Sequence, residues 1–296
     1  MLSILIPTYN CNVTALVTEL HDQCSSIPED FEIIIQDDAS TNLEESHLNK
    51  DLQNLSSVVY FENNSNLGRS ANRNLLASRA KFDLLLFIDA GTFPKSESYV
   101  KTYLTNFDAE LRVGGMTCLE NPPPKPYKLR WLYTKKREGF SEENIKNQSV
   151  ICSSNFLITK PVFQKNKFDE SLKKYGCEDV VFFDSIITRG HSIDYLDNPV
   201  IHDAKDDANT FIRKTEEAIE NLITLIDEEK IIAKRYGVSK LYNQCKKLRL
   251  QNAIVLLFKL CRKGLIKNFN SSNPSIRLYD FYRLGYYALQ KETNDA

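Results

Sequence analysis

Short, largely apolar runs recur along the first half of the chain, and each ends in polar or acidic residues. Three runs and the residues that follow them are Ser3–Ile6 with Pro7–Asn10, Phe31–Ile35 with Gln36–Asp38, and Leu84–Ile88 with Asp89. Runs without polar alternation are typical of strands that are buried on both faces of a sheet. We therefore expect strands near residues 2–7, 31–36, 57–62 and 84–88.

Segments with helical spacing separate these runs. One apolar stripe comprises Leu16, Val17, Leu20 and Cys24, and another comprises Val100, Tyr103, Leu104 and Phe107. The first stripe predicts a helix over about residues 13–25, and the turn-rich segment 63–68 should open another that extends to about residue 80. Alternating strands and helices predict an α/β fold, with a mainly parallel sheet flanked by helices.

The second half of the chain is predicted to contain a long irregular segment, then further strands and helices of the α/β domain, and finally a set of helices. Residues 121–126 contain four prolines and should be irregular, and with the polar residues 138–147 they form either a lid or an ordered connector. A helix should follow Glu178-Asp179 and end at Gly190, and a short strand should end at His202. We expect a catalytic domain over residues 1–210 and a C-terminal helical extension over 211–296.

Two apolar stripes support the helical extension. Thr210 is the expected cap of the first helix, and a later helix should form the second stripe. The first stripe comprises Ile212, Thr215, Ile219, Leu222, Ile223 and Ile226. The second comprises Leu250, Ile254, Leu257, Phe258, Cys261 and Leu265.

The near-neutral net charge conceals an asymmetry between the two predicted domains. Residues 211–296 hold 16 Lys and Arg against 9 Asp and Glu, whereas residues 1–210 hold 22 against 30. Between Lys240 and Tyr279 there are nine basic residues and no acidic one. Two interpretations are open: the basic helices dock on the acidic domain, or they make peripheral contact with an anionic membrane surface.

Several protein classes are disfavoured. No apolar run reaches the roughly 18 residues that a membrane span needs, and the first strand begins at once, so no signal peptide is expected ahead of it. The seven cysteines form no Cys-x-x-Cys pair, which favours reduced thiols and a cytoplasmic protein. A dinucleotide-binding glycine motif and a P-loop are both missing, and no nucleic-acid partner is expected.

Three acidic sites remain as candidates for chemistry: Asp37-Asp38, Asp89 and Glu178-Asp179. Ligands of open α/β sheets bind beyond the carboxyl ends of the strands, where these residues should lie. Asp89 is therefore either a ligand for a metal or sugar hydroxyl, or the cap of a following helix. Acid-rich strand ends suit a hydroxyl-bearing ligand, a general base, and a divalent cation that holds phosphates.

Five short motifs in order resemble those of family 2 glycosyltransferases, over roughly residues 1–205. They are Ser3–Asn10, Asp37–Ser40, Asn66–Asn74, Phe87–Asp89 and Glu178-Asp179. The resemblance implies a GT-A fold, a nucleoside-diphosphate sugar as donor, and transfer with inversion to a saccharide or glycolipid acceptor, as in the assembly of bacterial surface polysaccharides. The donor expected here is a UDP-sugar, and the location expected is the cytoplasm or the inner face of the membrane.

The resemblance also implies roles for individual residues of the donor site. Pro7 and Tyr9 resemble the lining of the nucleobase pocket, and Asp38, beside Asp37, resembles the carboxylate that accepts a base N–H. Asp89 resembles the first acid of the Asp-x-Asp motif, which contacts the ribose and the metal. Arg69 and Arg73 are both candidates to reach the diphosphate.

For catalysis, Asp179 matches the general base that deprotonates the acceptor hydroxyl. Glu178 resembles the neighbour that orients the acceptor, and His202 resembles a further metal ligand.

One residue departs from the family pattern. Gly91 stands where the second acid of Asp-x-Asp is expected. Mn²⁺ or Mg²⁺ would then be weakly held by Asp89 and His202, with phosphates and water completing its shell. Two alternatives are that Thr92 or water replaces the missing acid, or that the protein is an inactive sugar-nucleotide binder acting as an assembly partner.

Overall fold

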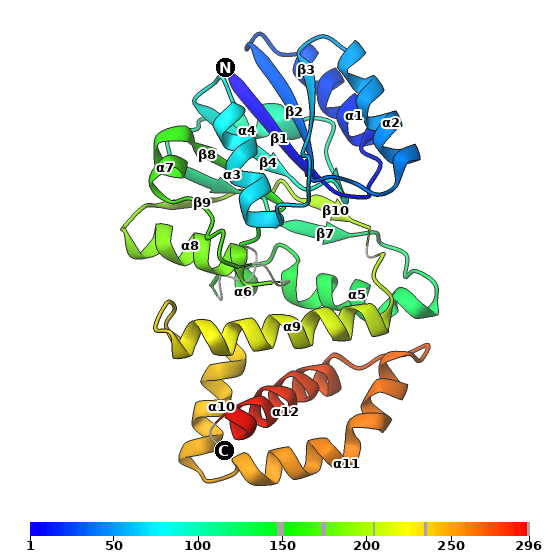
Figure 1. Ribbon diagram of the computed structural model, residues 1–296, viewed down its shortest axis with the longest axis vertical. Coiled ribbons are helices and arrows are strands. Elements are labelled where there is room, and N and C mark those ends of the chain that lie inside the picture. The colour runs from blue at the N-terminus through cyan, green and yellow to red at the C-terminus, as the bar shows by residue number, and fades with distance from the viewer. Residues whose placement is uncertain (147–150, 173–175, 204, 234–235, 295–296) are drawn as a thin grey trace. The chain divides into compact units, whose positions relative to one another are not determined.

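The chain forms two compact units, shown in Figure 1, which traces the whole fold. The computed structural model describes residues 1–146, 151–172, 176–203, 205–233 and 236–294. The first unit comprises residues 1–119, 134–173 and 178–203, and the second comprises residues 120–133, 174–177 and 204–296.

The first unit contains all the strands that the structure describes. In chain order they are β1 (Leu2–Thr8), β2 (Phe31–Asp37), β3 (Val58–Glu62), β4 (Leu84–Ile88), β5 (Thr92–Pro94), β6 (Leu111–Val113), β7 (Met116–Cys118), β8 (Asn155–Thr159), β9 (Ile193–Tyr195) and β10 (Val200–His202). Its helices and helical turns are α1 (Thr14–Ser25), α2 (Leu43–Asp51), η1 (Leu52–Asn54), α3 (Arg69–Arg79), α4 (Tyr99–Leu104), η3 (Thr134–Glu138), α6 (Glu142–Lys146), α7 (Lys160–Lys165) and α8 (Glu178–Thr188).

The strands form two sheets. The large sheet has the order β3-β2-β1-β4-β8-β6-β9, in which β1 to β4 are mutually parallel and β8 runs antiparallel to both its neighbours. A small sheet has the order β5-β10-β7. The prediction of a mainly parallel sheet flanked by helices is confirmed, because the apolar runs are the buried central strands.

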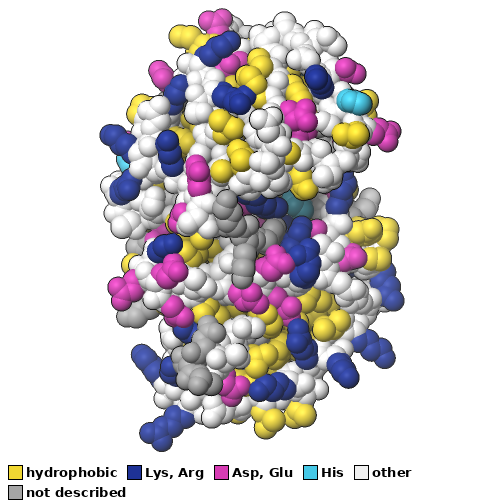
Figure 2. Space-filling view, in the orientation of Figure 1, with side chains coloured by type: hydrophobic (Ala, Val, Ile, Leu, Met, Phe, Trp, Pro, Cys, Tyr) yellow, Lys and Arg dark blue, Asp and Glu magenta, His cyan; other side chains and the backbone are white. Residues whose placement is uncertain are grey.

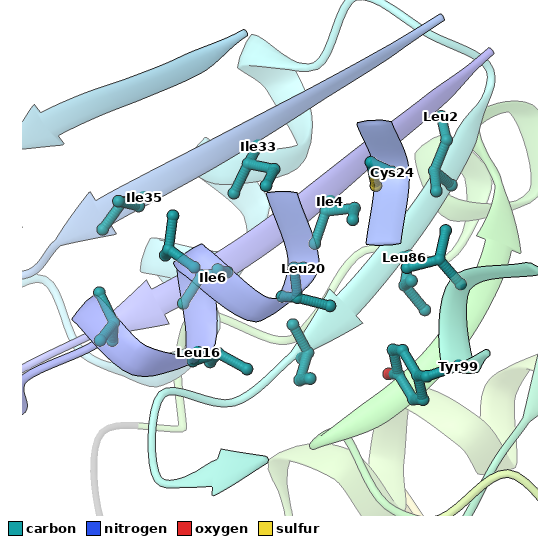
Figure 3. Packing of buried hydrophobic residues seen from close by; sticks show 14 of the residues in the cluster. Leu2, Ile4, Ile6, Leu16, Leu20, Cys24, Ile33, Ile35, Leu86 and Tyr99 are labelled. Atoms are coloured by element: carbon teal, nitrogen blue, oxygen red, sulfur yellow. The ribbon is translucent and has the colours of Figure 1, made fainter. Parts of the chain in front are cut away.

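Alternate residues of the central strands pack on opposite faces of the large sheet. Figure 3 shows one face, where Ile4, Ile33 and Leu86 point toward Leu20 of α1 and toward Tyr99. On the other face, strand residues such as Leu5 and Phe87 pack with α3, α7 and α8. Fully apolar strands are needed because helices exclude water from both faces. The sheet therefore holds the strand ends rigidly.

The predicted elements of the first unit lie close to their expected bounds. α1 covers the predicted helix at residues 13–25, and Gly68 precedes α3 with a φ of +88°. The prediction that residues 121–126 lack regular structure is wrong in part, because a 3-10 turn, η2 (Lys125–Tyr127), begins within them and leads into a helix. Pro126 is tolerated there because the first positions of a helical turn need no backbone donor.

The second unit is helical. Its elements are η2, α5 (Lys128–Tyr133), α9 (Ala208–Asp227), α10 (Gly237–Lys247), α11 (Gln251–Phe269) and α12 (Ile276–Asn294). Tyr133 of α5 packs with Phe211 of α9 and Tyr279 of α12, with ring centroids 5.4 Å apart in each pair, and the latter two rings stack at 5.3 Å. Residues 120–133, which are distant in sequence, are thereby tied to the C-terminal helices. Within the described residues, none of the helices has both the length and the apolar composition that a bilayer crossing requires.

Two sequence-based predictions fail in this unit. Thr210 does not cap α9; Asp207 does, and its carboxylate accepts the Thr210 backbone N–H at 2.7 Å. This contact lowers the pKa of Asp207. The predicted α11 stripe is also only partly buried: Phe258 and Leu265 lie inside, whereas Leu250 and Leu257 are about half exposed. The face of α11 that packs against α12 is therefore narrower than the apolar stripe predicted from the sequence.

Candidate active site

Three neighbouring strands deliver the candidate residues to one edge of the large sheet. β2, β1 and β4 are adjacent and parallel, so their carboxyl ends meet there. Thr8 at the end of β1 lies in register with Asp37 of β2, and Asp89 directly follows β4. Pro7 and Tyr9 stand at the same edge, where Tyr9 is 47% exposed. An aromatic ring with that much free surface is available to cover a planar ligand.

Asp37 is fully buried and is held by protein groups. Its carboxylate accepts from the Ser40 N–H at 2.8 Å, from the Tyr60 hydroxyl at 2.8 Å and from the Ser46 hydroxyl at 3.4 Å. Burial raises the pKa of Tyr60, and the Asp37 charge adds to the effect, so the phenol stays protonated and donates. Asp37 therefore fixes the turn after β2.

Asp38 fastens the loop that leads into α3. Its Oδ1 accepts from Asn63 Nδ2 and from the Leu67 N–H, both at 2.8 Å, and its Oδ2 accepts from the Gly68 N–H at 2.9 Å. A carboxylate oxygen can accept two hydrogen bonds, so Oδ2 keeps capacity for one ligand donor. Asp38 thus shapes this loop, and its backbone follows β2 at the edge where the candidate residues meet.

A network of buried amides surrounds Asp38, and we did not predict it from the sequence. Gln36 donates to Asn63 at 2.9 Å, and Asn63 donates to Asn72 at 3.0 Å. Asn72 in turn donates to the Gln36 backbone carbonyl at 3.1 Å. The sequence held a signal for this network, since Asn72 is a polar residue at a buried position of α3 and Gln36 is one in an apolar strand. Buried amides need hydrogen-bond partners, so polar residues at such positions predict contacts between them.

The two candidate arginines have different environments. Arg73 is 3% exposed, and its Nη2 donates to Asp89 Oδ1 at 2.6 Å, whereas the Asp89 side chain keeps 30% of its surface exposed. Arg69 is 52% exposed and lies 3.5 Å from the Glu178 carboxylate. Arg73 is therefore a buried charge held in place by its ion pair with Asp89. Arg69 is a cation at the surface of the site.

Glu178 and Asp179 begin α8 after a left-handed turn at Gly176 and Cys177, whose φ values are +88° and +71°. Burial and the neighbouring Glu178 charge raise the pKa of Asp179 to about 7, although Arg73 and Arg69 oppose the shift. The charges of Asp179 and Asp89 both act on the Cys152 thiol, whose pKa burial raises to about 12. Arg69 and Arg73 lie one turn apart on α3 and contact Glu178 and Asp89, so the start of α8 and the end of β4 both border this helix.

His202 ends β10 of the small sheet. It lies in register with Thr92 of β5 and with Cys118 of β7. Thr92 donates from its hydroxyl and its N–H to the Asp89 carbonyl, at 2.7 and 3.0 Å. The pairing of β10 with β5 therefore places His202 next to Thr92, which follows the turn at Asp89.

The residues around this turn fit a weakly held ion at most. Among residues that the structure describes, no three His, Cys, Asp or Glu side chains are grouped to hold a metal. Asp89 and His202 would supply two ligands, with phosphates and water completing the shell. Gly91 leaves open space, since a Cβ there would meet nothing within 4 Å.

Residues 3–166 match the model of the glycosyl transferase family 2, which is more than half of the chain. The chain belongs to glycosyl transferase family 2. This confirms the family that the five motifs suggested.

Two curated relatives resemble parts of this family 2 glycosyltransferase. An uncharacterized glycosyltransferase of Haemophilus influenzae is 38% identical over 94 residues, covering 30% of this chain and 29% of that protein. The poly(ribitol-phosphate) beta-glucosyltransferase of Bacillus spizizenii is 35% identical over 113 residues, covering 37% and 17%. The matched segments thus span less than a third of either relative.

Solved structures share the fold of this family 2 glycosyltransferase. A mannosyltransferase of Pyrobaculum calidifontis, in complex with GDP-Man and Mn²⁺, superposes with a TM-score of 0.56 at 14% identity, over 99% of this chain and 86% of that one. S. aureus TarS 1-349, in complex with UDP, gives 0.53 at 15% identity, over 99% and 91%. The GT-A-like fold with C-terminal helices is confirmed.

Proposed function

We propose that the protein is an inverting glycosyltransferase that moves a hexose from a UDP-sugar to a hydroxyl of a polysaccharide or glycolipid acceptor. The proposal is supported by two contacts of α3, in which Arg69 lies 3.5 Å from Glu178, the neighbour of Asp179, and Arg73 pairs with Asp89, and by burial that raises the pKa of Asp179 to about 7. A base near the operating pH and a cation cluster are the two requirements of a direct displacement.

In the proposed reaction, Asp179 takes the proton of the acceptor hydroxyl while the hydroxyl oxygen bonds to the sugar C1. The bond from C1 to the diphosphate oxygen breaks on the opposite side, and its electron pair leaves with UDP. Arg69 contacts the diphosphate and stabilises its developing charge, and the buried Arg73, paired with Asp89, adds a fixed positive charge nearby. Glu178, 3.5 Å from Arg69, orients the acceptor. One displacement inverts the configuration at C1.

For the donor, we assign Pro7 and Tyr9 to the faces of the base and the free acceptor position of Asp38 Oδ2 to a base N–H. Uracil offers that N–H at N3, but guanine offers one as well, so the donor panel must include both. Mn²⁺ or Mg²⁺, where bound, would rest on Asp89 and His202 and would supply charge to the leaving diphosphate. The glucosyltransferase named above acts on a ribitol-phosphate polymer, which supports a polymeric acceptor.

A second function is an inactive donor-binding protein, which Gly91 favours because it removes an expected metal ligand. Release of UDP from each UDP-sugar of a panel, and of GDP from GDP-mannose, discriminates the two. The proposed enzyme hydrolyses one donor slowly without acceptor, and Asp179→Asn lowers that rate about a hundredfold. Asp22→Asn is the matched control, because Asp22 is a largely exposed carboxylate on α1. Donor binding with no UDP release by the wild type would favour the inactive binder.

A further inference from the structure

The outer face of α11 carries leucines where a packed helix normally carries polar residues. Leu256 is 61% exposed and Leu260 is 74% exposed, whereas Phe258 and Phe269 are fully buried. With about 3.6 residues per turn, the two leucines fall on the side of the helix opposite to the two phenylalanines. α11 therefore has one apolar face that packs on α12 and a second one that the helical unit leaves uncovered.

The end of α10 and the turn that leads into α11 are exposed as well. Residues 246–250 are Lys-Lys-Leu-Arg-Leu, and all five are exposed. Leu248 is 69% exposed, and Arg249 occupies a left-handed turn with a φ of +57°. We call the exposed set of this turn and this helix face the leucine-lysine face. Its members are Lys246, Lys247, Leu248, Arg249, Leu250, Leu256, Leu257, Leu260, Lys263 and Lys267.

The charge of this face is of one sign. In the described part of the chain, none of its lysines or its arginine forms a salt bridge with an acidic side chain. Figure 2 shows hydrophobic side chains gathered with lysine and arginine side chains over α10–α12, in the lower part of the view. Exposed leucines among unneutralised cations are the composition of a surface that rests in a bilayer interface.

We propose that the leucine-lysine face binds an anionic membrane surface, with the leucines entering the interface and the cations contacting lipid phosphates. A second copy of the chain fits this face less well. A symmetric dimer would set the same patch against itself and so bring five cations against five, with no acid between Lys240 and Tyr279 to offset them. An anionic surface supplies the opposite charge and an apolar phase together. This proposal does not depend on the proposed transfer reaction.

The test is co-sedimentation of the full chain with vesicles of phosphatidylcholine alone and of phosphatidylcholine mixed with phosphatidylglycerol, at low and at high salt. Binding is expected to the mixed vesicles and to weaken at high salt. Each cation near an anionic surface contributes about fivefold in affinity, so Lys246→Gln, Lys247→Gln and Arg249→Gln together should weaken binding on the order of a hundredfold. Leu256→Gln with Leu260→Gln should weaken it by about tenfold or more.

Matched controls exist in the first unit. Lys50→Gln, Lys101→Gln and Lys167→Gln remove three exposed cations there, and Leu43→Gln changes an exposed leucine of α2. These variants should sediment like the wild type. Failure to sediment at low salt, or loss with the control variants as well, would overturn the proposal. So would a wild-type dimer in light scattering that the leucine substitutions dissociate, because the face would then belong to a second copy.

Discussion

Arg73 donates to Asp89 at 2.6 Å, and the arginine is almost fully buried while the aspartate keeps part of its surface free. Asp89 is therefore already neutralised by a fixed cation before any donor or metal arrives. A buried guanidinium is costly without its partner, so the pair has a structural role besides any role in binding. Substitutions at Asp89 will report on both roles together.

Breaking this pair should lower the stability of the protein. We expect Asp89→Ala to cost about 2–4 kcal/mol, somewhat less than a fully buried pair, because the carboxylate is partly exposed. Asp89→Asn keeps an acceptor for Arg73 and should cost less than half as much. Urea unfolding of the two variants measures the difference. Equal losses would contradict this expectation, because they would show that an uncharged acceptor contributes nothing and that only the charge of Asp89 holds Arg73 in place.

Asp38→Ala should weaken UDP binding by roughly 10- to 150-fold, the effect of losing a charged hydrogen bond. It also frees the Leu67 and Gly68 N–H groups, so the loop before α3 loosens. Asn63→Ala is the matched control, since it removes one donor to Asp38 and leaves the carboxylate in place. Calorimetric titration with UDP separates the roles: if both variants lose affinity equally, Asp38 acts only through the loop.

The raised pKa of Asp179 predicts a pH profile. The proposed base must be ionised, so UDP release should rise as pH increases through about 7 and level off above it. Asp179→Asn should abolish that dependence along with most of the rate. A rate that stays independent of pH between 5.5 and 8.5, values that bracket the pKa by about 1.5 units, would place the base elsewhere, with Glu178 the first alternative.

The same pKa has a consequence for stability. A carboxyl whose folded pKa lies above its unfolded value holds its proton more tightly in the folded state, so stability is lost as pH rises toward 7. Asp179→Asn should therefore leave stability near pH 4 unchanged and raise it at pH 8. The gain is at most about 4 kcal/mol, from about 1.4 kcal/mol per pKa unit. Melting temperatures at the two pH values measure it, and a destabilised variant at pH 8 would contradict the burial argument.

Metal dependence should be weak and adjustable. We expect Mn²⁺ to tighten UDP-sugar binding modestly and His202→Ala to remove that effect. Gly91→Asp should strengthen it, because the position is open and its backbone is compatible with a side chain. Thermal shift with Mn²⁺ or with EDTA compares the three proteins. Donor binding that ignores both EDTA and His202→Ala would remove His202 from the site.

Two glycines of the helical unit should respond in opposite directions to alanine. A Cβ on Gly285 of α12 would lie 2.5 Å from the buried Phe258 ring, so Gly285→Ala should cost about 1–3 kcal/mol by overpacking. Gly264 of α11 has nothing within 4 Å, and Gly264→Ala should stabilise the helix by up to about 1 kcal/mol. Urea unfolding tests both, and a neutral Gly285→Ala would show that α11 and α12 can separate slightly at no cost.

The elements that could be predicted from the sequence are those whose residues form a local hydrophobic pattern. Apolar runs ending at Asp37 and Asp89 located the central strands and the edge where they meet, because sheet burial leaves little choice of residue there. The partners of each carboxylate did not follow, since the Asn63 and Leu67 contacts to Asp38 depend on how a loop returns to the sheet. The site roles of all the candidate residues remain predictions.

The helical end shows the same limit. α12 was not predicted as a separate helix, although Tyr279, Tyr282 and Tyr286 recur at helical spacing. Their phenol groups need buried partners, and two of them donate to Glu216 and Glu220 of α9. Spacing alone also misplaced Leu257, because an apolar residue near the edge of a stripe is buried only if a neighbouring helix covers it.

The interleaving of the two units decides how the protein can be divided. Residues 120–133 leave the strand-bearing unit, join the C-terminal helices through Tyr133, and return before β8. A fragment ending at residue 210 would keep α5 but lose most of α9 and all of α12, which would strip Tyr133 of both its aromatic partners. A chimaera made by joining fragments of two relatives at a single point would therefore break this packing. A folded chimaera would need residues 120–133 and the C-terminal helices to come from the same parent protein.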